Sequence, residues 1–277
     1  MSQVWLITGS GSGLGYALAE AALKAGNKVI AGARRLAELD ALVGEYGANI
    51  SPVALDVRDE AAAKNAVEQA VETYGCLDVL VNNAGYQINA PFEQISPEQF
   101  RDVIETCLFG VVYTTRAAIP IMRRQRSGYI FQISSIGGRV TIPGNSPYHA
   151  AKWAVGGFSD SLADEVASFG VKVCTLEPGG MRTNFAERAN KQTAALLPDY
   201  QASVGPVLEM MAAAQKDSES DPGKVADVIV TLSQRNEVPK RLVLGTAAAA
   251  YVEQTELART EEARKNSDLT RSTVASA

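Results

Sequence analysis

Short runs of apolar, largely β-branched residues alternate along the chain with longer segments of helical periodicity. Their apolar positions are nearly continuous, which is typical of strands buried on both faces. These runs occupy residues 4–8, 28–33, 50–57, 77–83, 129–135 and 171–177. A further run at 241–245 predicts an edge strand. The pattern therefore predicts seven strands.

The segments between these runs repeat their apolar positions at the spacing of helices that pack on a sheet. The predicted helices cover residues 14–25, 61–74, 97–124, 148–169 and 248–265. Repetition of strand, helix and strand predicts an α/β fold with a doubly wound, mostly parallel sheet covered on both faces. Neither an internal repeat nor a linker divides the chain, so we expect one domain over residues 1–277.

The pattern loosens after Pro178. Residues 184–222 are rich in alanine and are interrupted by three prolines, which predicts short helices in a mobile surface segment. We expect this segment to form a lid over the substrate. Its large apolar residues predict a bulky, apolar substrate; they are Phe185, Leu196, Leu197, Met210 and Met211. The last dozen residues, 266–277, are expected to form a loose tail.

Composition and charge narrow the class of protein. Hydrophobic residues make up 46% and charged residues 21% of the chain, as in soluble globular proteins. The net charge of −5 argues against general affinity for nucleic acid. No apolar run is long enough to span a membrane. The first apolar segment, from Val4, lacks the charged and apolar regions of a signal peptide, so none is expected. Cys76, Cys107 and Cys174 have no metal-ligand spacing, so we expect no metal and a cytoplasmic location.

A glycine-rich segment, "TGSGSGLG" at 8–15, lies directly after the first predicted strand and before a predicted helix. In that position, backbone N–H groups and the helix N-terminus can bind a pyrophosphate. The spacing of Gly9, Gly13 and Gly15 differs from the common G-x-G-x-x-G form. A dinucleotide site is favoured by the context, and a plain strand-to-helix turn is the alternative.

The end of the second predicted strand indicates which dinucleotide binds. NAD-binding folds often carry an acidic residue there for the ribose hydroxyl. This chain reads "GARR" at 32–35, with Ala33 at the acidic position and Arg34 after it. Because an arginine pairs with a 2′-phosphate that an acid would repel, the sequence favours NADP(H) over NAD(H). Alternatively, Arg34 and Arg35 are solvated residues at the start of a helix.

Six short motifs follow one another along the first two thirds of the chain. They are "TGSGSGLG" (8–15), "LDV" (55–57), "NNAG" (82–85), "ISS" (133–135), "YHAAK" (148–152) and "PGGMRT" (178–183). In order and spacing they resemble those of the classical short-chain dehydrogenase/reductases, and the resemblance covers about residues 3–183. The resemblance implies a single-domain Rossmann fold. It also implies an oxidoreductase that moves a hydride between nicotinamide and a carbonyl or secondary alcohol.

The resemblance assigns catalysis to Ser135, Tyr148 and Lys152. Tyr148 and Lys152 are four residues apart and share one face of a helix. We expect the lysine to lower the pKa of the phenol toward neutrality, which would make it a general acid or base. Ser135, at the end of a strand, would donate to the substrate oxygen, while strand alternation turns Ser134 away. His149, the only histidine, lies about 100 degrees around the helix and is predicted to be structural or to lie at the pocket edge.

The same resemblance implies a set of residues that bind the cofactor. Asp56 is similar to the residue that meets adenine, Asn83 and Gly85 to the turn at the ribose, and the motif at 178–183 to the loop over the nicotinamide. Lys152 would also hold the ribose. The full set is Gly9, Ser12, Gly13, Leu14, Gly15, Arg34, Arg35, Asp56, Val57, Asn83, Ala84, Gly85, Tyr148, Lys152, Pro178, Gly179, Met181 and Thr183.

One position departs from the family. Where the family has an asparagine that holds a water beside the lysine, this chain has Cys107, within "TCLFG" at 106–110. A thiol cannot copy an amide. Either another water carries the proton, or the relay is impaired and the protein is a non-catalytic NADPH-binding regulator. A reactive thiol is not supported, because the sequence places no obvious cation beside Cys107.

The resemblance also implies a quaternary structure. Members pair as homodimers or homotetramers through two long helices, which here are 97–125 and 148–169. The expected partner is a small-molecule substrate with a carbonyl or alcohol group. Neither nucleic acid nor a membrane is expected as a partner.

Overall fold

Seven parallel strands form one sheet in the order β3-β2-β1-β4-β5-β6-β7. The computed structural model describes residues 2–183, 185, 195–218 and 220–275. The strands are β1 (Val4–Thr8), β2 (Lys28–Ala33), β3 (Ile50–Ala54), β4 (Val79–Asn82), β5 (Gly128–Ile133), β6 (Val171–Pro178) and β7 (Arg241–Leu244). All seven predicted strands are therefore confirmed, with β7 at one edge of the sheet.

Four strands, β3, β4, β5 and β7, end one to three residues earlier than the apolar pattern predicted, and the first two matter most for the site. β3 ends at Ala54, and residues 55–57 leave the sheet, although the N–H of Leu55 still donates to the Ala33 carbonyl at 3.0 Å. β4 ends at Asn82 rather than at Asn83. In both places the chain turns out at the carboxyl edge of the sheet. These turns carry predicted cofactor residues.

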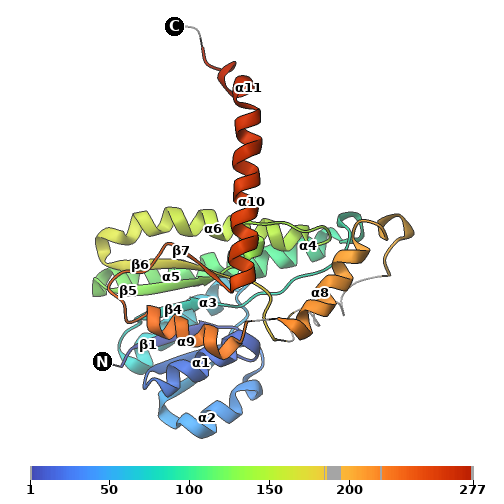
Figure 1. The fold of residues 1–277 in the computed structure, drawn as a ribbon. Helices are drawn as coiled ribbons and strands as arrows, with labels where there is room; N and C mark the ends of the chain where they lie inside the picture. The colour runs from blue at the N-terminus through green and yellow to red at the C-terminus, as the bar shows by residue number, and fades with distance from the viewer. Residues whose placement is uncertain (1, 184, 186–194, 219, 276–277) are drawn as a thin grey trace.

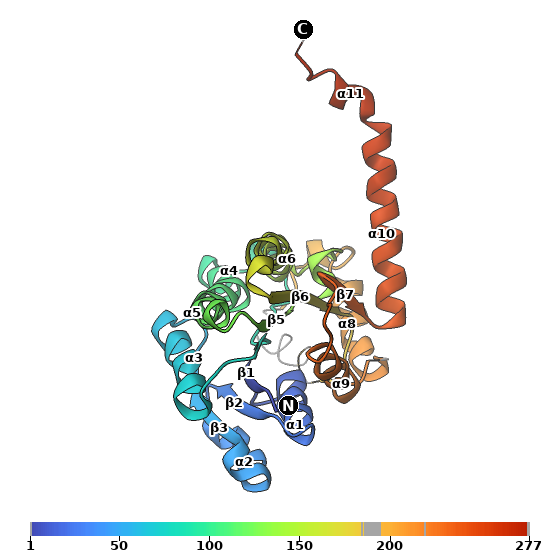
Figure 2. The same cartoon turned by 90° about the vertical axis from the view of Figure 1, so that its left-hand side faces the viewer.

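Helices cover both faces of the sheet (Figures 1 and 2). One face carries α3 (Glu60–Tyr74), α4 (Pro97–Ile104), α5 (Gly110–Gln125) and α6 (Ser146–Val166). The other carries α1 (Gly13–Lys24), α2 (Asp40–Tyr46) and α9 (Pro222–Leu232). Each face buries its own apolar core, as a doubly wound fold requires. The predicted fold class is confirmed.

The predicted helix 97–124 contains a change of helical pitch. Ser96 and Gln99 form a capping box at the start of α4, with Pro97 as its first residue. A π-helical turn, Glu105–Phe109, then joins α4 to α5. Such turns recur at functional sites. This one places Cys107 in the protein interior, at 0% exposure.

Short helices follow β6, as the prolines predicted. Pro198 begins the 3₁₀ turn η7 (Pro198–Tyr200), Pro206 is the second residue of α8 (Gly205–Asp217), and Pro222 is the first of α9. Proline is tolerated in a first helical turn, where its missing N–H has no helical partner. The rest of the predicted lid, residues 184, 186–194 and 219, lies outside the described residues.

The C-terminal helix α10 (Thr246–Lys265) starts at the carboxyl edge of the sheet and projects away from it (Figure 1). The segment predicted as a tail, 266–277, contains the short helix α11 (Ser267–Arg271), which continues the chain beyond α10. In the second half of α10, the Arg259 guanidinium lies 4.6 Å from the centre of the Trp153 ring on α6. Within the described part of the chain, no helix is both long and apolar enough to cross a membrane.

Candidate active site

A cavity of about 1460 Å³ opens at the carboxyl edge of the sheet. Parallel α/β sheets bind ligands at this edge, where loops from neighbouring strands converge. Its walls come from the segments that follow each of the seven strands. All the predicted catalytic and cofactor residues except Gly15 line it. The fold therefore brings residues that are far apart in the sequence together around one cavity.

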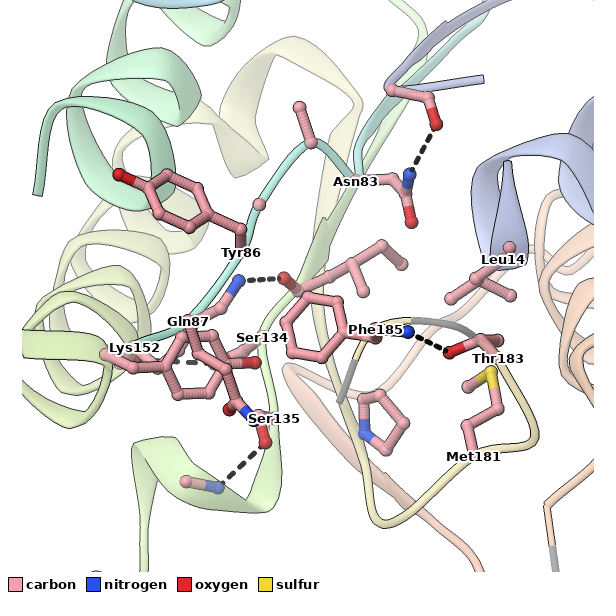
Figure 3. A pocket seen from close by; sticks show the side chains of 18 of the residues that line it. Leu14, Asn83, Tyr86, Gln87, Ser134, Ser135, Lys152, Met181, Thr183 and Phe185 are labelled. Carbon is pink, nitrogen blue, oxygen red and sulfur yellow. Dashed lines mark hydrogen bonds between the residues drawn. The ribbon is translucent and has the colours of Figure 1, made fainter. Parts of the chain in front are cut away.

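The glycine turn after β1 packs closely against α1 and against the side chain of Asn83. Gly9 and Gly13 have φ angles of 70° and 57°, which favour glycine. A Cβ on Gly15 would lie 2.2 Å from the Gly9 carbonyl oxygen, so Gly15 lets α1 approach the turn instead of lining the cavity. Asn83 Nδ2 donates to the Thr8 carbonyl at 2.9 Å. It also lies 3.3 Å from the Gly9 carbonyl oxygen, the bond drawn in Figure 3. The side chain of Asn83 therefore stabilises the turn.

The first turn of α1 offers its backbone N–H groups toward the cavity. Ser12 is the N-cap residue, but its side chain forms no capping hydrogen bond, and the first turn contains no acidic residue. Gly13 and Leu14, the first residues of the helix, line the cavity. Uncapped amides and the positive end of the helix dipole suit an anionic group.

At the end of β2, Ala33 is buried while Arg34 and Arg35 are exposed and line the cavity. Arg35 is paired with Glu38. Arg34 makes no salt bridge with any residue that the structure describes, so its guanidinium is available to a ligand. The hydrogen bond from Arg58, at 2.7 Å, is the main cause that lowers the pKa of Asp56. Sequence reasoning missed Arg58, which also lines the cavity.

The three predicted catalytic residues meet beneath the cavity. Tyr148 and Lys152 lie on α6 at 7% and 3% exposure, and Ser135 follows β5. The Lys152 ammonium donates to the Ile133 carbonyl at 2.7 Å and lies 5.5 Å from the centre of the Tyr148 ring. As expected, Ser134 points elsewhere: its hydroxyl donates to the Lys152 carbonyl at 3.4 Å (Figure 3).

The expected lowering of the Tyr148 pKa was wrong. Burial is the main cause that raises the pKa of the phenol, and a hydrogen bond with Ser135 lowers it only in part. Burial also lowers the pKa of Lys152 and so disfavours the cation that was expected to stabilise a phenolate. Tyr148 is consequently protonated at neutral pH, the form of a proton donor.

Cys107 lies under the same site. Its thiol donates to the Tyr86 carbonyl at 3.2 Å. No cation beside Cys107 was expected from the sequence, but Lys152 is close enough to act on the thiol. Burial nevertheless dominates and raises the pKa of Cys107, so the group remains a protonated thiol.

The loop after β6 closes one side of the cavity. Pro178, Gly179, Met181 and Thr183 line it, and the Gly179 N–H donates to the Leu244 carbonyl at 3.1 Å. The Phe185 ring lies 6.0 Å from the Tyr148 ring, centre to centre. Of the other apolar residues predicted for the lid, Met210 and Met211 line the cavity, whereas Leu196 and Leu197 do not.

Several cavity residues carried no clear signal in the sequence. Tyr86 and Gln87 follow the "NNAG" turn, Ile142 and Asn145 precede α6, and Tyr251 lies on α10. Position after a predicted strand was the available clue, because every such loop reaches the carboxyl edge. His149 lines the cavity at 8% exposure, as predicted. Among the described residues, no cluster of three or more His, Cys, Asp or Glu side chains suits a metal ion.

A doubly wound parallel sheet, a glycine turn at its first strand and a Ser-Tyr-Lys cluster define a dinucleotide-binding oxidoreductase. Residues 3–194 match the short chain dehydrogenase family. The chain is 46% identical over 252 residues to oxidoreductase BOA17 of Botryotinia fuckeliana, covering 91% of this chain and 92% of that protein. The chain belongs to the short-chain dehydrogenase family.

Solved structures agree with this assignment. A short-chain dehydrogenase from Streptomyces avermitilis superposes with a TM-score of 0.90 at 36% identity, over 99% of this chain and 100% of that one. An alcohol dehydrogenase from Thermococcus sibiricus complexed with 5-hydroxy-NADP has a TM-score of 0.72 at 25% identity, over 88% and 96%. A 3-ketoacyl-(acyl-carrier-protein) reductase from Brucella melitensis complexed with NADH has 0.74 at 28%, over 87% and 96%. Both NADP-type and NAD-type cofactors therefore occur among similar structures.

Proposed function

We propose that the protein is an NADP(H)-dependent oxidoreductase that interconverts a carbonyl and a secondary alcohol, with Tyr148 as general acid and base. The observation that carries this proposal is the convergence of Ser135, Tyr148 and Lys152 in the cavity that also contains the glycine turn. A proton donor and a hydroxyl thus lie in the same cavity as a site for a dinucleotide.

The walls of the cavity fit a nicotinamide dinucleotide. The uncapped first turn of α1 would hold the pyrophosphate, and Asp56 and Val57 would lie at the adenine. Pro178, Gly179, Met181 and Thr183 would close over the nicotinamide. Arg34, without a salt bridge among the described residues, would pair with the 2′-phosphate, which supports NADP(H) over NAD(H).

The chemistry that a bound nicotinamide supplies is hydride transfer. The protein's own residues supply the proton and fix the substrate. Tyr148, kept protonated by burial, donates a proton to the carbonyl oxygen, and Ser135 donates a hydrogen bond to the same oxygen. Lys152 holds the ribose and, through the Ile133 carbonyl, ties α6 to β5.

The substrate side of the cavity favours a bulky apolar compound. Phe185, Met210, Met211 and Tyr251 line it, and the Phe185 ring packs on Tyr148. Large apolar side chains around a few polar groups are typical of small-molecule sites. The apolar parts of the substrate would contact these side chains while its carbonyl reaches Ser135 and Tyr148.

The remaining proposals concern the whole protein. We place it in the cytoplasm as a single Rossmann-type domain that forms a homodimer or homotetramer through its long helices. Phe109 and Trp153 support this arrangement, because they lie beside α5 and on α6 and are 39% and 42% exposed. Large apolar side chains exposed on helices are often covered by a partner.

A second candidate function is a non-catalytic NADPH-binding regulator. The observation that favours it is Cys107, whose thiol is committed to the Tyr86 carbonyl where the family carries an amide. The intact Ser135, Tyr148 and Lys152 cluster favours the enzyme.

The test is NADPH oxidation with a panel of ketones, aldehydes and diketones, with NADH in parallel and Arg34→Ala as a variant. We expect turnover with NADPH and a rise of tenfold or more in the NADPH dissociation constant of Arg34→Ala, on the order of one charge-assisted hydrogen bond. NADH binding should be unchanged in this variant. NADPH binding without turnover in the wild type, together with turnover in Cys107→Asn, would favour the regulator.

A further inference from the structure

His149 lies between the catalytic tyrosine and the loop that bears the catalytic serine. It is the only histidine in the chain and follows Tyr148 on α6. Both of its ring nitrogens are hydrogen bonded to the backbone of one loop. Nδ1 lies 2.8 Å from the Gly137 carbonyl oxygen, and Nε2 lies 3.1 Å from the Ile142 backbone nitrogen.

These partners determine the tautomer. A carbonyl oxygen only accepts a hydrogen bond, so Nδ1 must carry the proton; a backbone N–H only donates, so Nε2 must be bare. The ring is therefore a neutral imidazole with one donor and one acceptor in use. Neither nitrogen is left for a proton transfer with the substrate.

The first of these bonds leads directly to Ser135. The N–H of Gly137 donates to Ser135 Oγ at 3.0 Å, while its carbonyl accepts from His149. A Cβ on Gly137 would lie 3.1 Å from His149 Nδ1 and 3.3 Å from Ser135 Oγ, so glycine permits this close arrangement. With its oxygen accepting from Gly137, Ser135 has its own proton available for Tyr148 or for a substrate.

The second bond fixes the next part of the loop. Within the described residues, no backbone–backbone hydrogen bond involves 141–143, and the Ile142 N–H donates to the His149 ring. Ile142 lines the cavity. The next backbone hydrogen bond along the loop is at Gly144, whose carbonyl accepts from the Ala90 N–H at 2.8 Å. His149 is thus the anchor in the middle of this loop.

We propose that His149 is a positioning residue that sets the Ser135 hydroxyl in register with Tyr148 by holding Gly137 and Ile142. Because Tyr148 and His149 are neighbours on one helix, any shift of α6 carries the proton donor and the serine loop together. This inference rests on the proposed function, since Ser135 and Tyr148 must act on the substrate for their register to matter.

The tautomer can be measured without a substrate. In the untagged protein labelled with ¹⁵N-histidine, a single histidine gives one pair of ring nitrogen signals. We expect the neutral form with Nδ1 protonated and Nε2 bare, although the opposite tautomer is favoured by free histidine in water. A ring protonated at Nε2 cannot accept from Ile142, and that result would overturn the proposal.

Kinetics separate positioning from a purely structural role. His149→Leu should lower kcat about tenfold or more, because each lost hydrogen bond is worth about 1 kcal/mol, with NADPH affinity unchanged. His149→Gln, whose amide supplies one donor and one acceptor, should recover most of this loss. If His149→Leu does not fold, His149→Gln and the NMR signals remain as readouts. Equal losses of kcat in His149→Leu and His149→Gln at matched thermal stability would contradict the inference.

A double-mutant cycle with Ser135→Ala tests whether the effect passes through the serine. If His149 acts through Ser135, then His149→Leu should lower kcat by less than about threefold in the Ser135→Ala background. An undiminished loss in that background would overturn this inference alone. Full turnover of Ser135→Ala by itself would instead contradict the proposed function.

Discussion

At the scale of single residues, the state of the Tyr148 side chain determines what the site does. Its hydroxyl is buried beside Ser135, and burial outweighs the hydrogen bond that would favour the phenolate. Sequence reasoning correctly placed the phenol and the lysine on one helical face. It could not know how much water remains around each group, and desolvation depends on the whole fold. The predicted direction of the Tyr148 pKa shift was therefore wrong. The assignment of Tyr148 and Lys152 to catalysis remains a proposal.

The protonation state of Tyr148 predicts opposite pH dependences for the two directions. Reduction needs the protonated phenol, so its kcat should stay constant between about pH 6 and 9, since the raised pKa keeps the proton in place. Alcohol oxidation needs the phenolate, so its kcat should rise about tenfold per pH unit below that pKa. Rates at saturating substrate and cofactor in both directions measure this. A plateau of oxidation near pH 7 would show that the pKa is near neutrality instead.

At Cys107, the resemblance to the family predicts which residue differs but not the environment of its side chain. The structure adds the π-helical turn, the bond to the Tyr86 carbonyl and the proximity of Lys152. None of these could be predicted locally, because a π-helical turn depends on how α4 and α5 pack rather than on the residues within it.

At the scale of elements, a buried carboxylate connects several segments near the cavity. Glu177, at the end of β6, is 0% exposed and lies 3.2 Å from both Arg139 and Arg241. Arg241, on β7, also pairs with Asp160 on α6, and Arg139 pairs with Glu256 on α10. The ion pairs thus connect β6, β7, α6 and α10. They anchor the middle of α10 at Glu256, and the preceding turns of this helix contribute Tyr251 to the cavity wall.

Glu177→Gln should destabilise the protein by about 2 kcal/mol. Breaking a buried pair costs up to about 3–5 kcal/mol, but here both arginines keep a second carboxylate. For a chain of this size the melting temperature should fall by roughly 4–8 °C, as followed by circular dichroism. Asp164→Asn is the matched control, since its pair with Lys240 is exposed and should contribute less than about 1 kcal/mol. Equal melting temperatures of the two variants would show that Glu177 is not a structural anchor.

At the scale of the whole molecule, the predicted order of strands and helices was close to the observed one. Continuous apolar runs identified all seven strands, because a doubly buried strand must be apolar throughout. The alanine-rich segment interrupted by prolines predicted short helices after β6, and the structure has such helices there. The positions of strands and short helices depend mainly on residues that are close in the sequence, and local patterns can therefore predict them.

Other features of the whole molecule depend on distant contacts. The direction of α10 and the contribution of Tyr251 to the cavity depend on where β7 ends in the sheet. The cavity residues Gln87, Ile142 and Asn145 lie in loops without a periodic pattern. Their positions are set by contacts between loops that are far apart in the sequence. One example is the hydrogen bond from the Asn145 side chain to the Gln87 side chain at 2.9 Å. No local pattern in the sequence predicts such a pair.

The turnover of Tyr148→Phe measures the proposed chemistry most directly. The substitution removes one hydroxyl from a side chain that is 7% exposed and leaves its ring against Phe185. NADPH oxidation with an accepted carbonyl should fall by at least about 10²–10⁴-fold, the range of general acid catalysis. NADPH binding, measured by fluorescence titration, should remain at the wild-type level. Turnover of Tyr148→Phe equal to that of the wild type would contradict the assignment of Tyr148 as the proton donor.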